Sequence, residues 1–326
     1  MIGLNASFSV IDTHTAGHPT RVILSGIPKL EGASVLDKRD DFRRRFDALR
    51  GLLLHEPRGH AAMVGLVPVP STVADYGAFF ISSYVYLDMC GHGTIGFAKT
   101  LASTGQITSA QGDSFTLETP AGVVTVGLVW SDDGRLSAVR IKNVPSFIGI
   151  EGLKIPFEPF GTVQTDIVYG GMWYALVDAG ALGLSLAPEH ASRLMTLGSE
   201  LKQAIKAAIV DNPTFAGAVP PSVLFYSDTA PGEATHFLVL ESNKFDRSPC
   251  GTGTAARVAM LDRQGRLKPD GTYVAKNILG VPFIARVAER QGDRVVAEIE
   301  GMAHLVAQST ILLEDTDPLR QGFLCK

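Results

Sequence analysis

The chain has 326 residues, with 29 Lys or Arg and 33 Asp or Glu, so its formal net charge is −4. This length suggests about two domains, each large enough to bury a hydrophobic core without disulfides or structural metals. A slightly acidic chain without basic clusters does not favour binding to nucleic acid or to an anionic membrane surface, because both need Lys and Arg gathered on one face. We therefore expect small molecules as partners.

The cellular compartment is indicated by the start of the chain and by its Cys residues. No stretch of about 18 apolar residues occurs, and the first fifteen residues lack the basic and apolar regions of a signal peptide. The three Cys lie at positions 90, 250 and 325. An odd number at wide spacing is a poor disulfide framework and is compatible with reduced thiols. We expect a cytoplasmic protein that does not enter a membrane.

Short β-type runs dominate the chain, and helices are the minority. Runs in which β-branched or aromatic residues recur between Gly, Pro, Asn and Asp predict strands at 7–12, 21–26, 62–68, 76–88, 115–130 and 137–143. The best helix candidates are 95–102, ended by Gly105, then 189–210, and 254–263, ended by Gly265. Each of these Gly follows the last turn, where a left-handed conformation is favoured.

An internal repeat organises the sequence. Residues 90–94 and 250–254 share the pattern Cys-Gly-x-Gly-Thr. An apolar strand precedes each copy, and a helix and three strands follow it, the strands over 114–141 and 272–299. The two Cys are separated by about half of the chain, which predicts two similar lobes that face each other across a cleft.

The same Gly-rich loops also fit the dinucleotide-binding pattern G-x-G-x-x-G or its variant with a final Ala. That fold should continue through the helix into a parallel strand with an acidic residue near its end. Here the helix gives way to strands that read as antiparallel, so the pattern disfavours NAD or FAD. The physical content of the loop remains: Gly-rich backbone at a helix N-terminus presents N–H donors to an anion, such as a carboxylate.

Cys90 and Cys250 are each expected at the N-terminus of a helix. The helix dipole there lowers the pKa of a thiol from about 8.5 toward neutrality and favours the thiolate. Two such Cys in repeated loops suit proton exchange by two bases, in which one thiolate removes a proton from carbon and the opposite thiol delivers one to the other face. Buried inert thiols and a disulfide between the two are the alternatives.

The remaining pattern does not favour a metal. His92 lies two residues after Cys90, but Thr252 occupies that place in the second loop, and no Cys-x-x-Cys spacing occurs. Residues 55–60 read HEPRGH, which imitates a zinc-protease motif but places its His five apart, with Pro and Gly that oppose a helix. We predict a turn there and no role for Cys325.

Two segments around the Cys residues, 88–96 (DMCGHGTIG) and 246–254 (DRSPCGTGT), resemble the signature blocks of the proline racemase family. Residues 12–22, 56–60 and 169–174 (YGGMWY) resemble supporting blocks, although His18 replaces the usual Glu. The family includes proline racemases, hydroxyproline 2-epimerases and 3-hydroxyproline dehydratases.

The resemblance implies an α/β (α+β) protein of the diaminopimelate-epimerase-like fold. Two pseudosymmetric lobes would each wrap an antiparallel-rich sheet around a central helix. We expect residues 1–128 with 306–326 to form the lobe that carries Cys90, and 129–305 the lobe that carries Cys250. The active site is expected in the cleft between the lobes.

The resemblance also implies site roles. Cys90 and Cys250 would be the paired acid and base, without a cofactor or a metal. Backbone N–H groups of four residues would hold the substrate carboxylate: Gly91, His92, Gly251 and Thr252. Asp246, helped by the His92 side chain, would contact the ring nitrogen. The alternative for Asp246 is a purely structural cap of the loop before the helix.

The activity implied is inversion of the α-carbon of proline or a hydroxyproline, an isomerase reaction on a small imino acid. Dehydratases of the family usually carry Thr at the second Cys, so Cys250 favours inversion. Dehydration of trans-3-hydroxy-L-proline and a non-catalytic imino-acid-binding protein remain the alternatives. His60 is the residue type that proline racemases have at this position, whereas the small Val64 leaves room for a hydroxyl on the substrate ring. The two features disagree, so the choice between proline and a hydroxyproline is not decided. A homodimer is compatible with the sequence.

Overall fold

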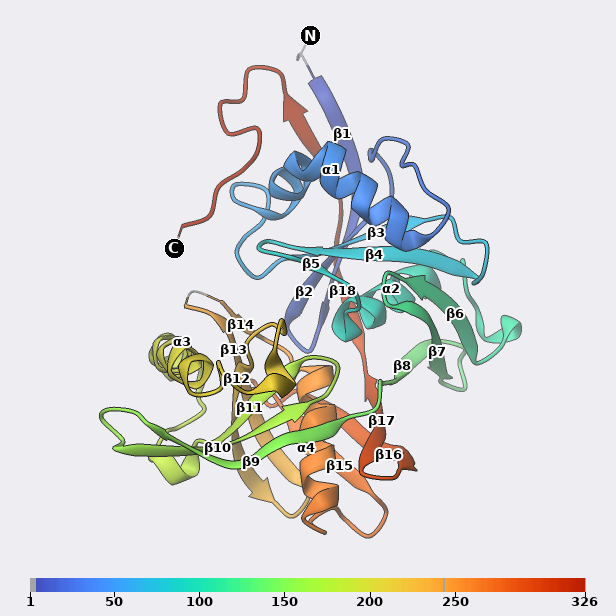
Figure 1. The fold of residues 1–326 in the computed structure, drawn as a ribbon. Helices are drawn as coiled ribbons and strands as arrows, with labels where there is room; N and C mark the ends of the chain where they lie inside the picture. Colours follow the sequence, from blue (N-terminus) through green and yellow to red (C-terminus); the bar gives the residue numbers. More distant parts are fainter. Residues whose placement is uncertain (1–3, 243, 326) are drawn as a thin grey trace. The chain divides into compact units, whose positions relative to one another are not determined.

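The computed structural model describes residues 4–242 and 244–325. The chain divides into two compact units, the first made of Met1–Ile141 with Gly301–Lys326 and the second of Lys142–Glu300. The lobe limits expected at residues 128 and 305 fall within strands of the first unit. Each unit is strand-rich, with few helices (Figure 1). Within the described residues, no helix is long and apolar enough to cross a membrane.

The first unit has one mixed sheet. Its strands are β1 (Leu4–Thr15), β2 (His18–Ile23), β3 (Val64–Val69), β4 (Tyr76–Ser82), β5 (Tyr86–Leu87), β6 (Ser114–Thr119), β7 (Gly122–Trp130), β8 (Leu136–Lys142) and β18 (Ala303–Glu314). Their order is β18-β1-β2-β3-β4-β6-β7-β8, and β5 pairs with β4. The pairs β2–β3 and β4–β6 are parallel, and the others are antiparallel.

The second unit repeats this topology. Its strands are β9 (Phe147–Pro156), β10 (Thr162–Tyr169), β11 (Trp173–Asp178), β12 (Ser222–Ala230), β13 (Glu233–Glu241), β14 (Lys244–Asp246), β15 (Thr272–Lys276), β16 (Pro282–Gln291) and β17 (Arg294–Gly301). The order β9-β10-β11-β12-β13-β15-β16-β17, with β11–β12 and β13–β15 parallel, matches the first unit strand for strand. The predicted pair of pseudosymmetric lobes is confirmed.

Each sheet packs against two α-helices. These are α1 (Val35–Leu54) and α2 (Gly91–Ser103) in the first unit and α3 (Ala191–Ala208) and α4 (Gly251–Arg263) in the second, with short 3₁₀ turns at Ser109–Gln111, Gly180–Leu182, Pro188–His190 and Pro213–Phe215. Helix α2 contacts β1, β2, β3 and β18, and α4 contacts β9, β10, β11 and β16. Most residues of both helices are buried, as expected for helices wrapped by a sheet.

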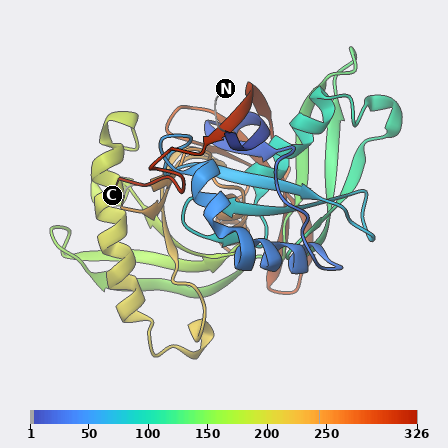
Figure 2. The same ribbon diagram turned by 90° about the horizontal axis from the view of Figure 1, so that it is seen from above.

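The other helix of each unit is longer. Helix α1 packs on β3 and β4, and α3 packs on β12 and β13; Figure 2 shows α1 in blue and α3 in yellow against strands of their own units. The first-unit core includes Phe8, Phe42 and Phe79, and the second-unit core includes Phe225 and Phe237. Both cores are apolar layers between a sheet and this outer helix.

Helix α1 is absent from the expectations drawn from sequence. Charged residues fill most of its first half, so no apolar stripe marks it there. The helix begins instead with a capping box, in which Ser34 Oγ accepts from Asp37 N–H and the Asp37 carboxylate accepts from Ser34 N–H. Its last turn, Leu52–Leu54, is fully buried and anchors it to the sheet.

The other predicted elements are present with shifted ends, except that the runs 76–88 and 115–130 are each divided by a turn into two strands, β4 with β5 and β6 with β7. Helices α2 and α4 begin several residues before the expected 95 and 254, because Gly-rich first turns have low helix propensity and hide the start. Gly105 (φ +71°) and Gly265 (φ +65°) end their helices as expected. Residues 55–60 form a turn, as predicted.

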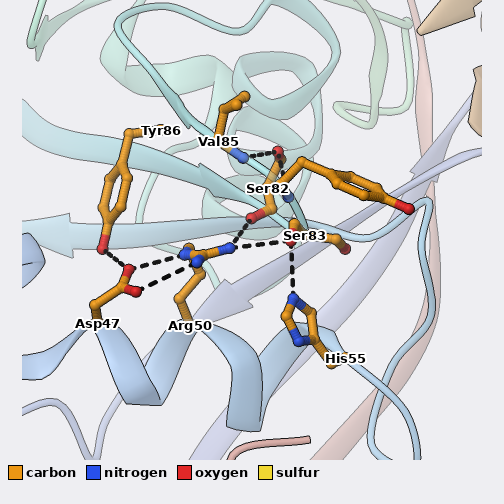
Figure 3. Close-up of polar contacts among 8 residues, drawn as sticks. Asp47, Arg50, His55, Ser82, Ser83, Val85 and Tyr86 are labelled. Carbon is orange, nitrogen blue, oxygen red and sulfur yellow. Dashed lines mark hydrogen bonds and ion pairs between the residues drawn. The ribbon is translucent and has the colours of Figure 1, made fainter. Parts of the chain in front are cut away.

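A polar cluster ties α1 to the turn between β4 and β5, which leads toward Cys90 (Figure 3). The Arg50 guanidinium binds the Asp47 carboxylate at 2.9 Å and donates to the carbonyl of Ser83 at 3.0 Å. Tyr86 donates to the same Asp47 carboxylate at 2.6 Å, and a His55 ring nitrogen lies 2.8 Å from the Ser83 carbonyl. These bonds satisfy turn carbonyls that face away from the strand ladder.

Close packing of α2 on β1 and β2 gives a test of this arrangement. A Cβ added to Gly96 would lie 2.6 Å from Thr13 Oγ1 and 3.1 Å from Thr20 Cβ. Gly96→Ala should therefore lower the free energy of unfolding by roughly 1–3 kcal/mol, measured by chemical denaturation. Gly91→Ala is the matched control, because a Cβ there meets nothing within 4 Å. Equal stability of the two variants would contradict the close packing.

Candidate active site

Cys90 is the N-cap residue of α2. Its backbone is extended, with φ −146°, and its side chain is buried. The first intrahelical bond runs from Thr94 N–H to the Cys90 carbonyl at 2.9 Å, and the Thr94 hydroxyl donates to the same oxygen. Cys90 makes no side-chain cap bond to the helix; its sulfur lies 3.4 Å from His92 Nδ1.

His92 is held by residues of β1 and β2. The Thr15 hydroxyl donates to the His92 carbonyl at 2.9 Å. The buried His18 ring meets the His92 ring edge to face, with centroids 4.4 Å apart. The block at residues 12–22 therefore supports the His92 ring beside the Cys90 sulfur. His18, which replaces the Glu usual in this family block, places an imidazole against that ring.

Cys250 is the N-cap residue of α4, at the position equivalent to Cys90. Unlike Cys90, it has a positive φ of +65°, and its sulfur accepts from Gly253 N–H at 3.2 Å. A non-Gly residue with positive φ is strained and persists only where its surroundings hold it.

Two sets of hydrogen bonds hold the Cys250 loop. Cys250 N–H donates to Ser248 Oγ at 3.1 Å, and the Ser248 hydroxyl and N–H both donate to Asp246 Oδ1 at 2.8 Å. His236 Nδ1 lies 3.0 Å from the Pro249 carbonyl and Nε2 lies 2.7 Å from the Tyr273 hydroxyl. A carbonyl can only accept, so Nδ1 carries the proton.

Burial sets the ionisation of this second site. It raises the pKa of Asp246 to about 6, although the hydrogen bonds from Ser248 lower it. Burial and the nearby Asp246 charge together raise the pKa of Cys250 to about 11, against the lowering effect of Tyr174, Thr252 and Gly253. The expectation of a lowered pKa is therefore wrong for Cys250, because desolvation outweighs the donors at the helix N-terminus. Burial also lowers the pKa of His236 to about 4, so its imidazole is neutral.

Tyr174 is a site residue that the sequence interpretation does not single out. Its hydroxyl lies 3.5 Å from Cys250 Sγ and 2.6 Å from Thr252 Oγ1. The side chain comes from β11, within the block at residues 169–174 that the sequence marks only as a family resemblance. That block was the available signal, but the spacing of 76 residues from Cys250 gives no indication of contact.

Both helix starts leave room for a ligand beside the first N–H groups. A Cβ on Gly91 would meet nothing within 4 Å, and one on Gly251 would meet only Ile299 Cγ2 at 4.0 Å. The N–H groups of the first helical turn lack intrahelical acceptors and can bind an anion. No group of three or more His, Cys, Asp or Glu in the described part of the chain is arranged to hold a metal ion.

The predicted site residues thus gather within each unit around its Cys. Gly91 and His92 adjoin Cys90 in the first unit, while Gly251, Thr252 and Asp246 adjoin Cys250 in the second. None of the three Cys, all of which lie in the described part of the chain, forms a disulfide, and Cys325 is exposed.

The charge of Asp246 predicts a measurable effect on Cys250. In a Cys90→Ser, Cys325→Ser background, the ultraviolet absorbance of the Cys250 thiolate should rise with pH, with a midpoint at about 11. Asp246→Asn should lower that midpoint, because it removes the neighbouring negative charge and keeps an oxygen that accepts from Ser248. Asp166→Asn, which changes a half-buried carboxylate that accepts from Gly152, is the control. An unchanged midpoint in Asp246→Asn would contradict this account.

Comparison with known proteins finds relatives along nearly the whole chain. The sequence model of the family described as Proline racemase matches residues 10–324. The chain is 35% identical to a proline racemase of Clostridioides difficile, covering 98% of both chains, and 37% identical to a 4-hydroxyproline 2-epimerase of Chromohalobacter salexigens, covering 96% of this chain and 97% of the relative. It superposes with a TM-score of 0.83 on a hydroxyproline epimerase from Agrobacterium vitis solved with bound trans-4-hydroxy-L-proline, at 28% identity over 98% of this chain and 96% of that one. The chain belongs to the proline racemase family.

Proposed function

We propose that the protein is a cofactor-independent racemase or epimerase that inverts the α-carbon of proline or a hydroxyproline, with Cys90 and Cys250 as its acid–base pair. The observation that carries the proposal is the duplication of an N-cap Cys on a buried helix with a Gly-rich first turn, in two units of one topology. The proline racemase and 4-hydroxyproline 2-epimerase relatives, aligned over nearly their whole length, support this substrate class.

The two sulfurs would act on opposite faces of one carbon, which requires the two loops to face each other across the substrate. The Cys90 thiolate removes the α-proton and leaves a planar carbanion. The Cys250 thiol then delivers its own proton to the other face, so the product is the mirror-image centre and Cys250 is left as the thiolate. The raised pKa of Cys250 favours the form in which Cys250 holds the shared proton before this half of the cycle.

The substrate would be oriented by its carboxylate and its ring nitrogen. N–H groups of Gly91 and His92 in the first unit and of Gly251 and Thr252 in the second are the donors proposed for the carboxylate. Asp246, which is ionised above a pH of about 6, is proposed as the acceptor for the ring nitrogen. Three Cys that form no disulfide in the described structure support the cytoplasm as the proposed compartment.

The thiol pair gives the first test. Cys90→Ser and Cys250→Ser should each reduce inversion by several orders of magnitude, because an alcohol is a far weaker base than a thiolate near neutral pH. Inversion is followed by chiral chromatography with L- and D-proline and trans-4-hydroxy-L-proline. Cys325→Ser, at an exposed thiol, is the control and should keep wild-type turnover. Near wild-type inversion by folded Cys250→Ser would overturn the proposal.

The reaction type is resolved by NMR in D₂O. Inversion should place deuterium at the α-carbon of the product, whereas dehydration of a 3-hydroxyproline would remove the ring hydroxyl. A binding protein would bind the imino acids without either change. The assay therefore uses both prolines, trans-4-hydroxy-L-proline and both 3-hydroxyprolines, and a wild-type protein that exchanges no α-proton in any of them is not the enzyme proposed.

The helix N-termini predict selectivity for a planar anion. Pyrrole-2-carboxylate should bind competitively, because its flat α-carbon imitates the carbanion and its carboxylate fits the N–H donors. Its methyl ester should bind at least about tenfold more weakly, since it lacks the negative charge that these donors stabilise. Calorimetry measures both affinities. Equal affinity for the acid and the ester would remove the carboxylate-binding role of the loops.

A further inference from the structure

Tyr174 is fixed in place beside the Cys250 sulfur. The turn before β11 is docked tightly on the first turn of α4: a Cβ added to Gly170 would lie 2.2 Å from the Thr252 carbonyl oxygen and 2.8 Å from Ala256 N. The Tyr174 side chain, 2% exposed, comes from the start of β11 directly after this turn, and its hydroxyl lies in the Cys250 loop. Its hydroxyl therefore reaches the sulfur from a rigid element.

The donors and acceptors around the Tyr174 hydroxyl limit the hydrogen bonds that it can make. Tyr174 Oη and Thr252 Oγ1 are 2.6 Å apart, so one of them donates to the other. Both also lie near Cys250 Sγ, at 3.5 and 3.6 Å, where Gly253 N–H already donates at 3.2 Å. A neutral thiol is a weak acceptor, but a thiolate is a strong one, so hydroxyl protons would turn to the sulfur once it carries the charge.

The charged and titratable groups around Cys250 leave Tyr174 as a donor. Asp246, on the preceding segment, is the anion whose charge disfavours the thiolate, and Lys244 and Arg247 in turn act on Asp246. Burial and the neighbouring Cys250 hold the pKa of Tyr174 well above its usual value, so its hydroxyl keeps its proton throughout. The described groups that lower the pKa of Cys250 against its burial are the neutral donors Tyr174, Thr252 and Gly253.

We propose that the Tyr174 hydroxyl is a catalytic hydrogen-bond donor, which stabilises the Cys250 thiolate formed when Cys250 gives its proton to the substrate. The inference rests on the proposed function and names a further residue of the same site. The proposal assigns different surroundings to the two sulfurs. Hydroxyl and N–H donors lie beside Cys250 Sγ, whereas the His92 imidazole lies beside Cys90 Sγ.

The direct test measures the thiol without turnover. In the Cys90→Ser, Cys325→Ser background, Tyr174→Phe should raise the titration midpoint of Cys250 by about one to two pKa units, the size expected for a hydrogen bond to a charged group. Tyr226→Phe is the control, a partly buried tyrosine of the same unit whose ring packs beneath the Arg257 guanidinium at 3.8 Å. It should leave the midpoint unchanged. An unchanged midpoint in Tyr174→Phe, with the fold verified by circular dichroism, overturns the proposal.

Turnover supplies the second readout. With the native thiols, Tyr174→Phe should lower kcat/KM roughly 10- to 100-fold, matching the expected midpoint shift. For proline the loss must be equal in both directions, because the equilibrium constant between enantiomers is fixed. A shifted midpoint with unchanged kcat/KM would overturn the catalytic role.

Two other outcomes keep the proposals distinct. If Tyr174→Phe weakens pyrrole-2-carboxylate binding but leaves the Cys250 midpoint unchanged, the hydroxyl only orients Thr252, and the inference fails. If the wild-type protein exchanges no α-proton, the proposed function fails, while the titration still decides whether Tyr174 stabilises the thiolate.

Discussion

The position of each N-cap Cys sulfur depends on a packing constraint in the first turn of its helix. The Cys side chain folds back over that turn, so that a Cβ on Gly93 would lie 3.2 Å from Cys90 Sγ and one on Gly253 would lie 3.1 Å from Cys250 Sγ. Such separations are shorter than ordinary carbon–sulfur contact, and a side chain there would displace the sulfur. Glycine at the third position therefore keeps each thiol next to the N–H groups that an anion needs.

The constraint is shared, but the two sulfur environments are not. Cys90 has an extended backbone and an imidazole beside its sulfur, whereas Cys250 has a left-handed backbone held by Ser248 and a hydroxyl cluster beside its sulfur. Identical thiols would share one proton without preference. In the proposed acid–base pair, different surroundings would bias where that proton resides, because burial and the charge of Asp246 raise the pKa of Cys250 and favour its protonated form.

Much of this architecture follows from local sequence signals. The repeated Cys-Gly-x-Gly-Thr loops, their stop glycines and the three strands after each helix are short-range patterns, and they predict two units of equal topology. Helix α1 escapes such reasoning because it begins with a capping box and a charged half, and its apolar anchor is confined to its last turn. The Gly-rich first turns of α2 and α4 hide their starts for a related reason, their low propensity.

The site itself is predicted less completely. Cys90, His92 and Cys250 are marked by the loops that contain them, but the direction of the Cys250 pKa depends on burial, which spacing does not report. Tyr174 lies on β11, far from Cys250 in the sequence, and its contact with Thr252 depends on the close packing of Gly170 against α4. Tertiary packing, rather than local pattern, determines both features.

The pairing of β18 with β1 affects the order in which the two units can fold as the chain is synthesised. The second unit occupies one continuous stretch, and its ends are joined by the bond from Asn143 N–H to the Ala297 carbonyl. The first unit, in contrast, lacks its edge strand β18 until the last part of the chain is made. Until then, the backbone N–H and C=O groups of β1 that pair with β18 have no strand partner on that side. Because β18 also packs on α2, the second unit with its Cys250 loop is synthesised before the last strand that holds the Cys90 helix.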